Sequence, residues 1–164
     1  IMFRKKINYK KLILALIIPQ LAGFLGSIAN ITAIDTWYTT LNRPELNPPN
    51  WIFAPVWTTL FLLMGWALYL VWQKRPWGGI NKKVELALFI FYTQLIFNIA
   101  WSYLFFYFQS PVFALLDIVV LWVLILLNII FFLKVDWRAG VLLIPYLLWV
   151  SFASYLNYAI FLLN

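Results

Sequence analysis

The chain has 164 residues but contains no cysteine and no histidine, and only five of its residues are acidic. Without cysteine it can form neither a disulfide nor a thiolate metal site. Without histidine it lacks the commonest general base and the commonest metal and haem ligand. Because the five acidic residues are scattered along the chain, neither a metalloenzyme nor a Ser-His-Asp hydrolase can be built, and no metal site is predicted.

Charged residues are scarce as well, at 10% of the chain, whereas 65% of it is hydrophobic and the mean hydropathy is +0.90. A soluble domain carries about 25% charged and roughly 45–50% apolar residues. The composition therefore predicts an integral membrane protein, in contact with the lipid bilayer, and the length fits a single domain over residues 1–164.

Long apolar runs alternate with short polar segments along the chain. A run of roughly 20 apolar residues is enough for a helix to cross the hydrocarbon core. The predicted fold is therefore all-α, an integral membrane bundle of five transmembrane helices. The expected helices cover residues 12–34, 51–73, 84–108, 112–133 and 139–163, approximately.

The loop between the first two helices, residues 35–50, is here called the lid. Because proline fixes φ and disfavours helix in the residue before it, Arg43-Pro44 and Asn47-Pro48-Pro49 predict a stiff, non-helical segment. The tryptophans within and beside this loop indicate a cover over a ligand site. An aromatic belt at the level of the lipid headgroups is the alternative.

The twelve Lys and Arg residues are distributed unevenly. Five precede the first helix, four follow the second and two follow the fourth, so eleven share one side of the membrane. The positive-inside rule then places the N-terminus in the cytoplasm and the lid and the C-terminus outside. Because topology explains the surplus of positive charge, no nucleic-acid partner is predicted.

Three of the expected helices carry aromatic and polar side chains on one face. At helical spacing these faces comprise Trp57, Phe61 and Met64; Gln94, Asn98, Trp101 and Phe105; and Tyr146, Trp149, Ala153, Leu156 and Asn157. The amides must find partners inside the bundle, since an unpaired polar group is costly in lipid. Hydrogen bonds between helices are the alternative to ligand contacts.

Two further features carry polar groups into the predicted spans. Asp117 is the one acidic residue clearly inside a span, and an intramembrane carboxylate indicates function by default; the alternative is a partner for a Tyr or Trp donor. In the first helix, Gly23, Gly26, Ser27 and Asn30 form a face of small and polar residues. This face favours close helix packing over the lining of a cavity.

Together these faces predict a pocket beneath the lid, lined by Trp, Tyr and Phe with a few amides, hydroxyls and one carboxyl. Small-molecule sites are mostly apolar with sparse polar anchors. A flat, hydrophobic, aromatic ligand fits this lining, whereas an ion would require more charge and a sugar more polar groups.

The chain resembles the translocator protein family, also called the tryptophan-rich sensory proteins or peripheral-type benzodiazepine receptors, and looks like a bacterial-type member. The matching motifs are Trp37-Tyr38-x-x-Leu41-x-Arg43-Pro44, Asn47-Pro48-Pro49 with Trp51, Phe53, Pro55, Val56 and Trp57, Asn98-x-x-Trp101-Ser102, Asp117, and Pro145-Tyr146-x-x-Trp149-x-x-Phe152-Ala153-x-Tyr155-Leu156-Asn157. Each motif is weak alone, but their order across five spans is specific.

The resemblance implies a bundle that is usually a homodimer, with a cavity beneath the first loop. That cavity binds porphyrins such as protoporphyrin IX, as ligands rather than cofactors, and synthetic isoquinoline-carboxamides and benzodiazepines. Pocket positions are matched by Trp57, Asn98, Trp101, Trp149 and Ala153, and the lid region by Tyr38 and Trp51. Phe61, Ser102, Asp117 and Tyr146 complete the set of candidate ligand-binding residues.

The implied function is a membrane receptor or sensor in tetrapyrrole regulation or stress response, located in a bacterial inner membrane. Two alternatives stay open: a light-dependent porphyrin-degrading enzyme, with Trp57 and Trp149 as catalytic candidates, and a transporter of porphyrins or other lipophiles. The cholesterol-recognition pattern of the animal members lacks its Lys or Arg after Tyr158, which counts against sterol binding by that route.

Overall fold

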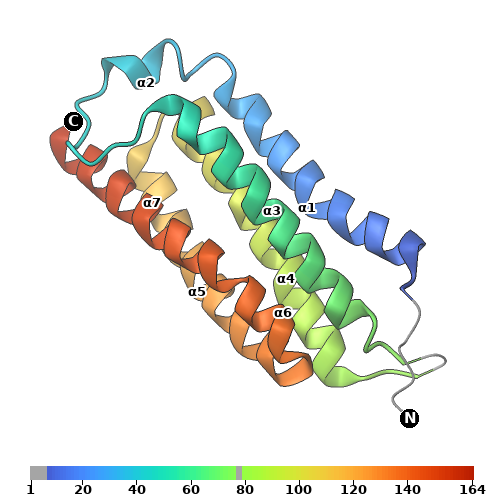
Figure 1. Ribbon diagram of the computed structural model, residues 1–164. Helices are drawn as coiled ribbons and strands as arrows, with labels where there is room; N and C mark the ends of the chain where they lie inside the picture. The colour runs from blue at the N-terminus through green and yellow to red at the C-terminus, as the bar shows by residue number, and fades with distance from the viewer. Residues whose placement is uncertain (1–6, 77–78) are drawn as a thin grey trace.

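The computed structural model describes residues 7–76 and 79–164. Three of the N-terminal cations used for orientation, Arg4, Lys5 and Lys6, lie outside these residues. The described chain forms an all-helical bundle in which five long helical segments run alongside one another (Figure 1). Each of the five is long and apolar enough to cross a membrane, which confirms the predicted fold class.

The observed elements are α1 (Tyr9–Asn30), α2 (Trp37–Thr40), α3 (Asn50–Trp72), α4 (Lys82–Ser102), the π-helical turn η1 (Tyr103–Tyr107), α5 (Pro111–Val135), α6 (Trp137–Leu142) and α7 (Ile144–Leu163). Two of the long segments are therefore interrupted. The third changes from α- to π-helix after Ser102, and the fifth is broken at Leu143, just before Pro145 at the start of α7.

The prolyl segments of the lid are non-helical, as predicted, and one helical turn, α2, precedes them. The turn lies before the prolines, whose restriction reaches back only to the residue preceding each ring. It ends at Leu41, where the backbone is extended. From there to Pro49 the lid has no helix within its described residues.

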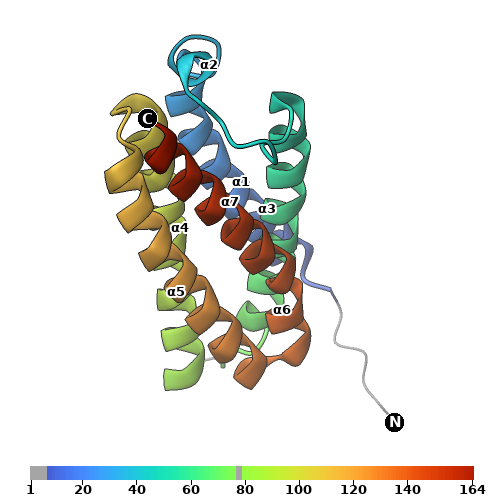
Figure 2. The same ribbon diagram turned by 90° about the vertical axis from the view of Figure 1, so that its left-hand side faces the viewer.

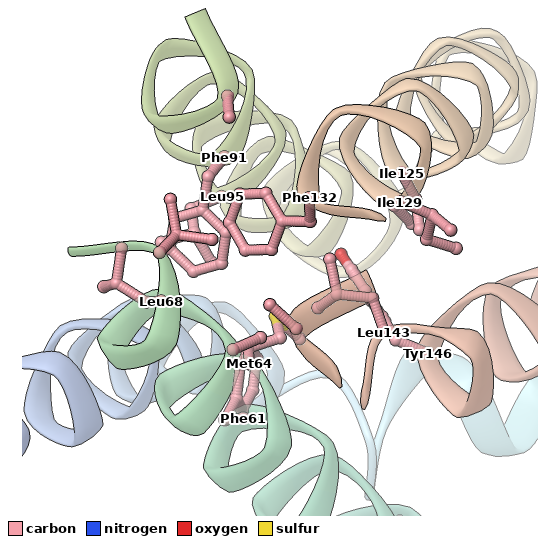
Figure 3. Packing of buried hydrophobic residues seen from close by; sticks show 14 of the residues in the cluster. Phe61, Met64, Leu68, Phe91, Leu95, Ile125, Ile129, Phe132, Leu143 and Tyr146 are labelled. Atoms are coloured by element: carbon pink, nitrogen blue, oxygen red, sulfur yellow. The ribbon is translucent and has the colours of Figure 1, made fainter. Parts of the chain in front are cut away.

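The hydrophobic core lies where α3, α4, α5 and the start of α7 meet, in the half of the bundle away from the lid. Figure 3 shows Met64, Leu68, Phe91 and Phe132 converging there from three helices. The rings of Phe91 and Phe132 stack with their centroids 5.6 Å apart. All four side chains are completely buried.

A close approach between α1 and α3 continues this packing. A Cβ atom placed on Gly65 would lie 2.7 Å from the Cα atom of Leu16 and 2.8 Å from the carbonyl oxygen of Ala15. Real Cβ atoms do not come so close to backbone, so only glycine fits at this crossing.

Toward the lid, α3 and α7 diverge (Figure 2). At the opposite end α3 packs against α6, and α7 packs along α5. The lid crosses the end of the bundle where α3 begins and α7 finishes (Figure 1). Two cavities lie beneath the lid, lined by residues of the lid and of the helices around it.

Candidate functional site

Two adjoining cavities lie beneath the lid. The inner cavity has a volume of about 90 Å³ and is lined by residues of the end of α1, the lid, α3, α4, η1 and α7. The outer cavity, of about 540 Å³, lies between α1 and α3. Trp57 and Trp101 line both cavities, so their indole rings form a boundary that a ligand could contact from either side.

Aromatic side chains dominate the inner cavity. Its aromatic lining comprises Tyr38, Phe53, Trp57, Trp101, Phe105, Phe106 and Trp149. Several of these rings pack on one another and are thereby held in place. Trp101 stacks on Phe105 with centroids 5.3 Å apart, and Trp149 meets Phe53 edge-on at 6.0 Å. Such a wall offers π-faces and edges to a flat ligand.

A chain of buried hydrogen bonds joins α4 and α7 beside the site, and one member of it, Asn98, lines the outer cavity. The Asn98 Nδ2 atom donates to the Tyr146 hydroxyl over 2.9 Å, and that hydroxyl donates to Gln94 Oε1 over 2.9 Å. The Gln94 amide nitrogen in turn faces the Met64 sulfur at 3.9 Å. Asn98 and Gln94 thus form hydrogen bonds between helices, the alternative to ligand contacts that was considered from the sequence.

Trp101 is oriented by a second polar chain. Its Nε1 atom donates to Asn157 Oδ1 over 3.0 Å, and Asn157 Nδ2 donates to the Pro111 carbonyl over 2.8 Å. These bonds connect α4, α7 and the first residue of α5. The Trp101 ring is therefore positioned from three elements before any ligand arrives.

Two buried polar atoms of the inner cavity's lining are unpaired. Trp149 Nε1 is a donor and Asn30 Oδ1 an acceptor, and neither has a hydrogen-bond partner among the described residues. Both residues line the inner cavity, and Asn30 also lines the outer one. Leaving such a group unsatisfied costs about 1–3 kcal/mol. The residues of the cavity wall therefore include one unsatisfied donor and one unsatisfied acceptor, both themselves buried, which a ligand reaches only when these side chains turn toward the cavity.

Tyr38 closes the inner cavity from the lid. It is 6% exposed and packs against Phe105 and Phe106. Its hydroxyl donates to Asn47 Oδ1 over 2.9 Å, and the Arg43 guanidinium lies 5.1 Å from the centre of its ring. The prolines thus hold Asn47 and Arg43 where they can fix the tyrosine that covers the site.

The small-residue face of α1 serves both of the uses considered for it. A Cβ atom on Gly23 would overlap the Phe61 ring at 2.3 Å, and one on Gly26 would lie 3.1 Å from Ser102 Oγ. These two glycines let neighbouring side chains pack close to α1. Ser27 and Asn30, farther along the same face, line the outer cavity.

The structure brings most of the predicted site residues together. Tyr38, Trp57, Trp101, Trp149 and Ala153 line the inner cavity, and Phe61, Asn98 and Ser102 line the outer one. Among the described residues, Trp51, Asp117 and Tyr146 line neither. Trp51 is 73% exposed, whereas Asp117 and Tyr146 are buried outside the cavity walls.

Many of the lining residues are absent from the candidate set, and two of them, Phe106 and Asn30, were missed for different reasons. Phe106 lies beside Phe105 in sequence, and α-helical geometry would direct the two about 100° apart. The π-helical turn η1 places both at the inner cavity. Asn30 is the last member of the polar face of α1. The sequence favours helix packing for that face over the lining of a cavity, so Asn30 was not a candidate.

The site is almost uncharged. Among the described residues that line either cavity, Asp35 alone carries a charge. The ion pairs lie at the opposite end of the bundle, where Asp136 is 2.9 Å from Arg138 and 3.7 Å from Lys74. Its hydrogen bond to the Arg138 side chain lowers the pKa of Asp136. The cavities therefore suit a largely apolar ligand.

The sequence matches one known family over nearly its whole length: a profile described as the TspO/MBR family covers residues 15–163. Similar proteins include a "Tryptophan-rich protein TspO" of Chlorobaculum tepidum, 46% identical over 87% of this chain and 88% of the relative. The protein of the same description from Archaeoglobus fulgidus is 40% identical over 96% and 99%. The "Translocator protein" of Bos taurus is 36% identical over 87% and 83%.

Proposed function

The chain belongs to the TspO/MBR family of membrane proteins, and from that premise we propose that it is a receptor for a metal-free porphyrin of the protoporphyrin IX type. The ligand binds beneath the lid, in tetrapyrrole regulation or stress response. The single observation that carries this proposal is the aromatic cavity pair, whose lining residues include a buried, unsatisfied donor, Trp149 Nε1, and a buried, unsatisfied acceptor, Asn30 Oδ1.

The sizes of the cavities indicate how such a ligand is seated. Pockets for small molecules usually measure about 300–1,000 Å³. The outer cavity, at about 540 Å³, falls in this range, whereas the inner one, at about 90 Å³, holds only part of a ligand. The macrocycle therefore occupies the outer cavity, with one edge entering between Trp57 and Trp101.

The polar groups of a metal-free porphyrin complement those of the site. A pyrrole N–H, at the centre of the macrocycle, can donate to Asn30 Oδ1 only if that oxygen lies over the ring face, and a propionate oxygen can accept from Trp149 Nε1. Each pairing relieves a desolvation cost of about 1–3 kcal/mol. Contact between the macrocycle and the indole rings supplies apolar burial and stacking.

The test is a titration of the purified protein with protoporphyrin IX, followed by the porphyrin absorption band so that the readout does not depend on the substituted indole. Trp149→Phe keeps an aromatic ring and removes the donor; we expect about tenfold weaker binding, equivalent to the loss of one buried hydrogen bond.

Trp122→Phe is the matched control. The Trp122 indole donates to Ser151 Oγ over 2.8 Å, away from the lining of both cavities. This variant should bind within about a factor of two of the parent protein. Equal affinities for the parent and the Trp149→Phe protein would count against the proposed seat of the ligand, and an absence of saturable binding by the parent would count against the function.

We extend the proposal to the placement of the protein in the cell membrane of a prokaryote, with the lid outside. Except for Arg43, the described cations lie at the ends of helices opposite the lid, which supports this orientation. Because the chain has no native cysteine, single cysteines at Glu45 and Lys134 can be labelled in intact cells. A membrane-impermeant maleimide should react with Glu45→Cys and not with Lys134→Cys.

A further inference from the structure

The outer cavity opens through the side of the bundle, between α1 and α3. Exposed residues form its rim on both sides: Phe24 and Ser27 on α1, Ile31 just after it, and Ala54 and Thr58 on α3. Phe24 and Ile31 are 64% and 70% exposed. Because these residues belong to or adjoin helices that span the membrane, the opening faces lipid along part of its length.

Polar side chains occur along this opening although lipid would disfavour them. Gln20 lies near the middle of α1, and its amide nitrogen donates to the Thr58 carbonyl over 3.1 Å, across the gap between the helices. Ser27 and Thr58 are exposed at the rim. The Ser27 hydroxyl donates to the Phe24 carbonyl and the Thr58 hydroxyl to the Ala54 carbonyl, so each keeps lone pairs that can accept a hydrogen bond from a ligand. This polar rim suits a molecule that has both an apolar body and a polar edge.

The lid, in contrast, is fastened to the end of α7. The Asn42 backbone N–H donates to Asn164 Oδ1 over 3.0 Å, and Asn164 Nδ2 donates back to the Asn42 carbonyl over 3.1 Å. Asn42 Nδ2 also donates to the Leu163 carbonyl over 3.2 Å. Entry from the aqueous side would have to break these bonds and lift the buried Tyr38 out of its aromatic contacts.

We propose that the ligand enters and leaves sideways, from the lipid bilayer, through the opening between α1 and α3, while the lid stays fastened. We call this opening the lateral portal; Ser27 and Ala54 mark its two sides. The inference rests on the proposed porphyrin-binding function and adds the route. The ligand it requires is a flat amphiphile that first partitions into the bilayer and then enters the outer cavity through the lateral portal.

The test measures rates in vesicles that contain the protein, with protoporphyrin IX supplied in the lipid. In Ser27→Phe/Ala54→Phe, two aromatic rings narrow the portal. A barrier on the route slows both entry and exit, so the association and dissociation rate constants should both fall, by about tenfold. Both residues also line the outer cavity, so the test rests on the two rate constants and not on Kd. The single variant Ser27→Phe should show the same pattern more weakly.

Two control variants complete the experiment. Ile28→Phe makes the same kind of substitution on α1 at a residue that is 45% exposed and lies outside the cavity linings, and it should keep the parent's rates. Asn42→Ala/Asn164→Ala unfastens the lid and should also leave the rates unchanged. The melting temperature of each variant establishes that it is folded.

The possible outcomes separate the route from the function. Faster exchange in the unfastened variant, with parent rates in the narrowed one, would show that the lid is the entrance and overturn the inference. In the narrowed variant, a raised dissociation rate constant with an unchanged association rate constant would also overturn the inference. The two substitutions would then weaken the hold on the bound ligand without slowing its passage. If the parent protein binds no porphyrin, the proposed function itself fails and the route with it.

Discussion

Away from the lid, α3 and α4 bury Met64, Leu68 and Phe91 completely, whereas beneath the lid Trp57, Trp101 and Trp149 keep part of their surface open to a cavity. The same helices contribute to both regions. The side chains beneath the lid are the larger ones, so a shortage of side-chain volume does not explain the open space. The wider separation of the α3 and α7 backbones toward the lid explains the open space (Figure 2).

The two regions also differ in their hydrogen bonds. The amides of Asn98 and Gln94 are joined through the Tyr146 hydroxyl, so helix packing there satisfies both side chains. At the cavities, Trp149 Nε1 and Asn30 Oδ1 find no partner in the described chain. The packed region thus satisfies its polar side chains by contacts between helices, whereas the residues around the cavities retain one unsatisfied donor and one unsatisfied acceptor.

The largest expected effect comes from forcing the packed region apart. Gly65→Ala places a methyl group 2.7 Å from the Leu16 backbone, which cannot move without shifting α1. Overpacking of this kind costs about 1–3 kcal/mol in the free energy of unfolding, measured by thermal or denaturant unfolding in detergent. Gly26→Ala meets only the Ser102 hydroxyl, at 3.1 Å, which can rotate away. It should change stability by less than about 0.5 kcal/mol, and equal losses in both variants would erase the contrast between the regions.

A smaller loss of stability is expected when the buried chain of hydrogen bonds between α4 and α7 is broken. Tyr146→Phe removes the hydroxyl and leaves Asn98 Nδ2 and Gln94 Oε1 without their partner. Hydrogen bonds between membrane helices contribute about 0.6 kcal/mol on average and at most about 1.7. With two bonds lost, unfolding should become easier by about 1–2 kcal/mol. Tyr158→Phe, at a residue that is 50% exposed, is the control; a matching loss there would mean that the chain of bonds adds no stability.

Much of the packed region could be predicted from the sequence because spacing reports which residues share a helix face. The recurrence of Gln94, Asn98 and Trp101 placed two amides and an indole together, and they do lie on the inward side of α4. Run lengths likewise predicted five spans, since each must match the thickness of a bilayer.

The cavity region was less predictable because its dimensions depend on the distance between helices, which no single helix encodes. Spacing could not show that α3 diverges from α7, or that η1 directs Phe106 inward beside Phe105. It also could not tell a tryptophan that lines a cavity from one that is exposed. Trp57 and Trp51 belong to one motif, yet only Trp57 lines the site.

A third prediction concerns a substitution that fills part of the inner cavity. Ala153→Leu extends a side chain into the inner cavity of about 90 Å³. Filling a cavity commonly raises the free energy of unfolding by about 0.5–2 kcal/mol, and we expect the lower part of that range. Binding of protoporphyrin IX should weaken at the same time, as measured by the absorption titration. A more stable protein with unchanged porphyrin affinity would show that the ligand does not use the inner cavity.

The smallest effect concerns the charged end of the packed region and its dependence on pH. Hydrogen bonding to Arg138, together with the charges of Arg138 and Lys74, lowers the pKa of Asp136 below that of the unfolded chain, about 3.9. A lowered pKa contributes stability that is fully present above the unfolded value and is lost as the pH falls through the folded one. Because Arg138 and Lys74 are half exposed, the loss should be only a few tenths of a kcal/mol to about 1 kcal/mol. Unfolding measured from pH 6 down to pH 3 should reveal this loss of stability in the parent protein.

The control variant is Asp136→Asn. Its side-chain oxygen can still accept the Arg138 backbone N–H at the start of α6, so the helix cap is kept while the charge is removed. This variant should therefore begin less stable at pH 6 and lose less on acidification, whereas an acid-induced loss as large as the parent's would assign the pH dependence to other carboxyl groups.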